Sequence, residues 1–276
     1  MISDAVKTAI IGLLFFLSLN CATPAVKQSE ISTPVVTVEK EEPELPMAFQ
    51  WVILAGLRGE PDAPRYLLTE KIGVVDLAHV RAFLNLTNEL HNVVTRKLSQ
   101  AKSSGGRAFY VRLRSPHAAG LTAVSDIKVD LEERPDPPAV DLVRDLAMTH
   151  GYLVELRQGD VFPPMFLSGS SFSQEDLQSN RLGIEIALLS SLTGLDAGRA
   201  ALTIFTDLRP VSMPATKPAS QERSYSYLPY VNGGTQDLPQ CFQYSPVMVS
   251  DQSRILGIRT IRSAWEWQSR PAPLAQ

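Results

Sequence analysis

Two short polar stretches carry the residue types that could support chemistry. The first is Asp76-x-x-His79, with Arg81 two residues further on. Residues three apart are neighbours on one face of a helix, so the carboxylate and the imidazole could share a site. A neutral imidazole is a good zinc ligand, and a carboxylate can bind the metal or orient the ring. The alternative is structural: Asp76 caps a helix, and His79 is simply hydrogen-bonded.

The second stretch holds Glu175, Asp176, Ser179 and Asn180. Its two carboxylates could act as a general base or bind a divalent metal, with His79 and Glu175 as candidate metal ligands. Helix capping and compensation of the helix dipole explain the same carboxylates without catalysis. Ser179 and Asn180 lie one turn further on and add hydrogen-bonding groups.

Better-defined catalytic motifs are absent from the sequence. There is no HExxH, no G-x-S-x-G, no Walker loop and no dinucleotide fingerprint. The two cysteines, Cys21 and Cys241, make neither a disulfide framework nor a cysteine zinc site. The formal net charge of -3 gives no reason to expect nucleic-acid binding.

Both polar stretches lie at predicted helix starts. Ser173 is a good N-cap, and Asp176 three residues later makes a variant capping box. The dense apolar residues that follow predict a central core helix to about residue 192, with its polar N-terminus facing a cleft. Asp76 is placed to cap a second helix, which runs to about residue 101. We expect the two helix starts to approach one another, so that His79 lies near Glu175 or Asp176.

The remaining pattern predicts a mixture of short elements. Residues 47–57 form a buried strand or a short helix, and Gly151 ends a helix that runs from about residue 136 to His150. Further strands are expected at 108–114, 121–131, 152–156 and 254–267, with a helix at 197–208. Prolines from Arg209 onward prevent long helices. The predicted fold class is α+β, a helical core with a small antiparallel sheet and long Pro-rich C-terminal loops.

Residues 1–21 resemble a bacterial lipoprotein signal peptide. An apolar run of 11 residues, 9–19, is too short for a membrane span of about 20 residues but suits a signal-peptide core. The run leads to Cys21, the candidate lipidation site, although Asn20 stands where a small residue is usual. A plain signal peptide or a short membrane anchor is the alternative. With lipid on Cys21, Ala22 resembles the signal for sorting to the outer membrane.

Residues 22–47 are predicted to form a disordered tether. Their mixture of Pro, Ser, Thr, Glu and Lys has no apolar face to bury, so the segment should stay extended. Residues 48–276 are then expected to form a single globular domain.

The segments Val75–Arg81 and Ser170–Gly183 together are similar to a bacterial family of exported and lipoprotein-like proteins of unknown function. Members pair a D-x-x-H-x-R helix start with an S-F-x-x-E-D-x-x-S-N-x-x-G helix start. The resemblance covers about a tenth of the chain and implies no known activity. It does imply one constellation of residues: Asp76, His79, Arg81, Glu175, Asp176, Ser179 and Asn180.

Two function classes follow from these observations. The first is a non-enzymatic envelope lipoprotein, a structural or binding module on the periplasmic face of the outer membrane. Its partners would be the membrane, through the lipid anchor, and an envelope protein. The second is an envelope hydrolase, with or without a divalent metal, that uses His79 with Asp76, Glu175 and Asp176. Convergence of these side chains in an open cleft would favour the enzyme, and separate burial in capping roles would favour the module.

Overall fold

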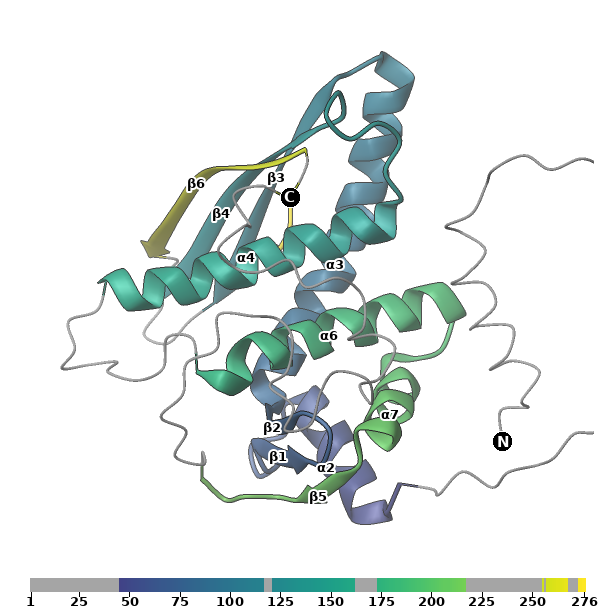
Figure 1. Ribbon diagram of the computed structural model, residues 1–276, viewed down its shortest axis with the longest axis vertical. Helices are drawn as coiled ribbons and strands as arrows, with labels where there is room; N and C mark the ends of the chain where they lie inside the picture. The colour runs from purple at the N-terminus through teal and green to yellow at the C-terminus, as the bar shows by residue number, and fades with distance from the viewer. Residues whose placement is uncertain (1–44, 117–120, 162–172, 217–254, 256, 268–272) are drawn as a thin grey trace, which may run out of the picture. The chain divides into compact units, whose positions relative to one another are not determined.

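A computed structural model describes residues 45–116, 121–161, 173–216, 255, 257–267 and 273–276. All of them belong to one compact unit, Leu45–Gln276. Within the described residues the fold has five helices and two three-stranded antiparallel sheets (Figure 1). The α+β class is confirmed, with two small sheets in place of the expected one. The signal peptide, Cys21, the tether up to residue 44, Cys241 and most of the Pro-rich C-terminal third lie outside the described residues.

Helix α3, Leu77–Ser104, is the longest element described. Asp76 caps its start by accepting a hydrogen bond from the Ala78 amide, as the sequence predicts. Gly105 ends it in the left-handed region, at φ 65°, which glycine adopts without steric cost. Its buried residues recur from Leu77 to Ala101, so one side of α3 is covered along nearly its full length.

Helix α6, Gln174–Thr193, is the central core helix that the sequence predicts. Ser173 and Asp176 form its capping box. Beyond that start its apolar side chains enter two separate hydrophobic clusters, with Ile184 and Leu188 in one and Leu182 and Ile186 in the other. Because both sides of α6 are covered by other elements, its apolar residues do not gather on one face of the helix.

Helices α3 and α6 cross in close contact at Gly183. A Cβ atom there would lie 2.3 Å from the Val80 carbonyl oxygen and 2.9 Å from the Leu84 amide nitrogen. Only glycine lets the two backbones approach so closely. This crossing fixes how the start of α6 meets the start of α3.

The first hydrophobic cluster lies under one sheet. The strands β3 Ala108–Pro116, β4 Leu121–Asp130 and β6 Ile258–Trp267 pair in the order β3-β4-β6. Alternate residues of β3 and β4, such as Val111 and Ile127, are buried against α3 and α4. The strands predicted at 108–114 and 121–131 are confirmed, and they pair with one another.

The second cluster is covered by a smaller sheet and two more helices. This sheet has the order β2-β1-β5 and consists of β1 Tyr66–Thr69, β2 Gly73–Asp76 and β5 Pro210–Ser212. Helices α2, Met47–Arg58, and α7, Ala197–Leu208, complete the cluster. Sequence analysis missed the β1–β2 hairpin, and residues 47–57, left open between strand and helix, are helical.

Helix α4, Ala139–Val161, contradicts two expectations. The predicted helix end at His150 is wrong, and so is the predicted strand at 152–156, because the helix continues through Gly151. A glycine inside a helix costs only about 1 kcal/mol. Burial of Val143, Ala147 and Val154 on one side of α4 outweighs this cost.

None of the described helices has the length and apolar composition needed to cross a membrane.

Candidate functional site

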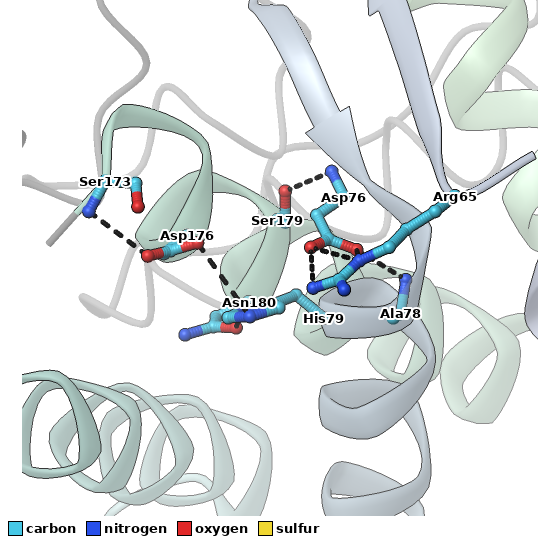
Figure 2. Close-up of polar contacts among 8 residues, drawn as sticks. All are labelled: Arg65, Asp76, Ala78, His79, Ser173, Asp176, Ser179 and Asn180. Carbon is cyan, nitrogen blue, oxygen red and sulfur yellow. Dashed lines mark hydrogen bonds and ion pairs between the residues drawn. The ribbon is translucent and has the colours of Figure 1, made fainter. Parts of the chain in front are cut away.

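The two polar helix starts lie against each other (Figure 2). The backbone N–H of Asp76 donates a 2.9 Å hydrogen bond to Ser179 Oγ, and the Gln178 amide donates to the Val74 carbonyl. Strand β2 and the first turn of α3 are thereby tied to the first two turns of α6. The predicted approach of the two starts is confirmed.

Asp76 is buried and has several partners. One of its oxygens accepts from the Ala78 amide at 2.9 Å, and Arg65 Nη2 donates to the other at 2.7 Å. Burial alone would raise the pKa of Asp76. The Arg65 hydrogen bond, the nearby positive charges of His79 and Arg65, and the Ala78 amide outweigh burial, so the pKa is lowered. Asp76 is thus a charged carboxylate committed to a helix cap and an ion pair.

Arg65 is a member of this site that sequence analysis missed. It immediately precedes β1, whose first residue, Tyr66, pairs with Asp76 across the β1–β2 hairpin. That register brings the guanidinium to the carboxylate, and the Arg65 pKa is raised, chiefly by the hydrogen bond to Asp76. Arg65 can be placed beside Asp76 only when the β1–β2 hairpin is known, and the two short strands did not reveal that hairpin in the sequence.

His79 lies between two side chains of α6. Its Nδ1 is 3.0 Å from Asn180 Oδ1, and its Nε2 is 3.8 Å from Asp176 Oδ1. In a doubly protonated ring, Nδ1–H donates a hydrogen bond to Asn180 Oδ1, whereas Nε2 and Asp176 form an ion pair at a distance too long for a hydrogen bond. About 26% of the His79 side chain is exposed, against 6% of Asp176.

The pKa of His79 is raised by its surroundings. Burial, the largest single influence, lowers it, but the negative charges of Asp176, Asp76 and Glu155 and the Asn180 hydrogen bond outweigh burial. Asp176 has a second role, since the Ser173 amide donates to its Oδ2 at 3.1 Å. One carboxylate therefore serves both the capping box and the imidazole.

Glu155 is the second residue that sequence analysis missed. It lies on α4, is 1% exposed, and its charge acts on His79. The prediction of a strand at 152–156 hid it. The available signal was the spacing of Val143, Ala147 and Val154, which is i, i+4 and i+11 on one helix face and continues past Gly151.

Two residues of the predicted constellation lie apart from His79 in role or place. Arg81 follows His79 by two positions on α3, and its guanidinium lies against Gly59, where an added Cβ would be 1.6 Å from Arg81 Nη1. Glu175 is buried at the start of α6, but its charge is not among the main influences on the His79 pKa. The structure therefore groups Asp76, His79, Asp176, Ser179 and Asn180 most closely.

The described residues give the metal hypothesis no additional support. Among them, no group of three or more His, Cys, Asp or Glu side chains converges as a metal site would require. A surface pocket of about 350 Å³ lies elsewhere, lined by Leu98, Ala101 and Lys102 near the opposite end of α3. What the group can do chemically is hold or release a proton at His79.

A second histidine is buried elsewhere. His150 Nδ1 is 2.8 Å from Ser125 Oγ, and Nε2 is 2.9 Å from Ser115 Oγ. Burial lowers the pKa of His150 to about 3, so the ring is neutral at physiological pH. This ring joins α4 to the sheet of β3 and β4 and has no part in the His79 group.

No protein-family model, curated protein or solved structure matches the chain. The family resemblance in the two helix starts therefore remains an expectation from the sequence.

Proposed function

We propose that this chain is a non-enzymatic lipoprotein of the cell envelope. A lipid on Cys21 holds it at the periplasmic face of the outer membrane, where the folded unit acts as a structural or binding module. The observation that supports the non-enzymatic role is that the two carboxylates whose charges act most strongly on His79 already have other partners. Asp76 caps α3 and pairs with Arg65, while Asp176 completes the α6 capping box and faces His79. A general base needs a carboxylate or imidazole free to accept a proton from substrate.

The alternative, an envelope hydrolase built on His79, is favoured by one observation. The imidazole is partly exposed beside a buried carboxylate. If the chain is a non-enzymatic module, His79→Gln and Asp176→Asn should lower the free energy of unfolding, and the wild type should hydrolyse no ester, amide or phosphoester substrate. A hydrolase activity that is lost in His79→Gln, with its fold intact, would establish the alternative.

The anchor is tested by replacing Cys21 in the full chain. We expect wild-type protein in the outer-membrane fraction, with a mature N-terminal cysteine that carries the mass of attached acyl chains. Cys21→Ala should remain unprocessed or leave the membrane, because the lipidated thiol is lost. Cys241→Ala is the matched control and should fractionate as the wild type does. Soluble wild-type protein with an unmodified N-terminus would contradict the proposal.

A further inference from the structure

Helix α2 presents an apolar face to solvent. Of its twelve residues, MAFQWVILAGLR, only Gln50 and Arg58 have polar side chains. Met47 is 84% exposed and Trp51 is 51% exposed. They are four residues apart and therefore neighbours on one face of the helix. A helix on the surface of a water-soluble domain normally turns charged or polar side chains outward, so this face needs an explanation.

The described elements pack on the other side of α2. Val52, Ile53 and Ala55 are buried in the second hydrophobic cluster. Gly56 contacts Leu77 of α3, and Leu54 packs beside Gly198 of α7. Figure 1 shows α2, in purple, at the periphery of the unit beside α7. The exposed face is therefore available to something outside the folded unit.

The position of α2 in the chain indicates what that is. Residues 22–44, 23 residues, connect Cys21 to Leu45, which is buried in the second hydrophobic cluster just before α2. A flexible chain of this length has a root-mean-square span of roughly 25–30 Å. With the thiol lipidated, the predicted tether would keep the start of α2 within reach of the bilayer surface. A tether of this kind raises the effective concentration of the second contact and makes a weak interaction productive.

We propose that the Met47–Trp51 face of α2 lies at the boundary between the headgroups and the acyl chains of the membrane that carries the anchor. This inference rests on the proposed lipidation of Cys21. Tryptophan prefers the membrane interface because its ring is apolar and its indole N–H can still donate to water or headgroups. Met47 is flexible and unbranched, so it can fill space between acyl chains. The contact would orient the folded unit relative to the bilayer, which a flexible tether alone cannot do.

The neighbouring charges specify the lipid. Residues 39–44 contain four glutamates and one lysine. Arg58, the basic residue of α2, is paired with Glu60. Anionic headgroups would be repelled by this acidic segment, so the favoured surface is one of zwitterionic phospholipid. Contact should depend on apolar burial and change little with salt.

Fluorescence of Trp51 tests the inference. The chain has three tryptophans, so Trp265→Phe with Trp267→Phe leaves Trp51 as the sole reporter. The lipidated full chain is reconstituted into phosphatidylcholine vesicles with brominated acyl chains, which quench only tryptophans that reach them. We expect strong quenching of Trp51 fluorescence in these vesicles. The Trp51 emission should also be shifted to the blue relative to the same protein without its lipid anchor in detergent-free buffer. Inclusion of phosphatidylglycerol should reduce the quenching.

A matched reporter on another surface provides the control. Ile261 of β6 is 59% exposed, similar to Trp51. Ile261→Trp in a chain whose three native tryptophans are replaced by Phe should show no quenching.

Mass spectrometry of the N-terminus separates the two failures. A lipidated chain whose Trp51 is unquenched overturns the docking inference and leaves the proposed anchor intact. An unlipidated Cys21 overturns both. Protection of Trp51 from aqueous iodide without lipid, together with a doubled molecular mass, would assign the face to a second copy of the chain and also overturn the inference.

Discussion

The charge on His79 contributes to holding the start of α6 against the start of α3. Its Nε2 faces Asp176, and its pKa is raised above the usual value of 6.5. A raised folded-state pKa means that the contribution to stability is fully present below about pH 6.5 and is lost as pH rises through the folded value. Asp176→Asn should therefore lower the His79 pKa and flatten this part of the stability profile. Histidine NMR titration, with urea unfolding between pH 6 and 8.5, measures both.

Glu175→Gln is the control for that experiment. Glu175 occupies the same helix turn but is not among the main influences on the His79 pKa. The His79 titration should move much less in this variant than in Asp176→Asn. Equal shifts in the two variants would show that general negative charge, rather than the Asp176 contact, sets the pKa.

His150 should have the opposite pH dependence. Burial between Ser115 and Ser125 lowers its pKa to about 3, below the unfolded value of about 6.5. The contribution of a neutral ring is present above pH 6.5 and is lost as pH falls from there toward 3. His150→Asn should be less stable at pH 7, because the buried Ser125 hydroxyl and the partly buried Ser115 hydroxyl lose their partner, but should lose less stability between pH 7 and 5. Urea unfolding of both proteins at the two pH values checks this, since the carboxylates contribute equally to each.

Among individual residues, the sequence predicted the members of the His79 group that helix geometry places there. Asp76 and Asp176 have capping roles, and their spacing to His79, Ser179 and Asn180 follows from the helical repeat. Arg65 and Glu155 could not be predicted in the same way. Each reaches the group through the packing of a third element, and that packing depends on contacts far apart in the sequence.

Among the elements, α3 and α6 depend on Gly183 for their crossing. Gly183→Ala would place a methyl group against the α3 backbone, which cannot yield as a flexible side chain would. We expect a loss of roughly 1–3 kcal/mol in the free energy of unfolding. Separation of the helices should also weaken the His79–Asp176 contact and lower the His79 pKa. Urea unfolding and histidine NMR measure the two effects.

Gly106→Ala is the matched glycine control. An added Cβ at Gly106 would meet its nearest neighbour, the Ser104 hydroxyl, at 3.4 Å. The change in stability should be within about 0.5 kcal/mol. A similar loss in both variants would mean that the close crossing at Gly183 is not the cause.

Helical periodicity made α3 and α7 predictable, a dense run of apolar residues made α6 predictable, and capping residues located the starts of all three. The β1–β2 hairpin was hidden because its strands have only four residues each, too few to show an alternating pattern. The true length of α4 was hidden for a different reason. A local signal at Gly151 favoured a stop, and tertiary burial of the next two turns overrode it.

For the whole molecule, the segment before Leu45 is expected to contribute nothing to folding. Deletion of residues 25–42 removes sequence without an apolar face to bury. The thermal unfolding midpoint should change by less than about 2 °C. Calorimetry of the deletion and of the full chain, both in the Cys21→Ala background, provides the measurement. A large decrease would show that the segment packs on the folded unit.

The position of α6 between the two hydrophobic clusters also determines how the molecule opens. Each cluster contains side chains of both α3 and α6. If one cluster comes apart, these two helices separate, and apolar surface in the other cluster is exposed as well. Local opening of one half is therefore coupled to loss of the whole fold. Amide protons in the middle of α6 should exchange with solvent only through global unfolding. The folded unit should therefore unfold in one cooperative transition, although its two sheets would suggest two independent ones.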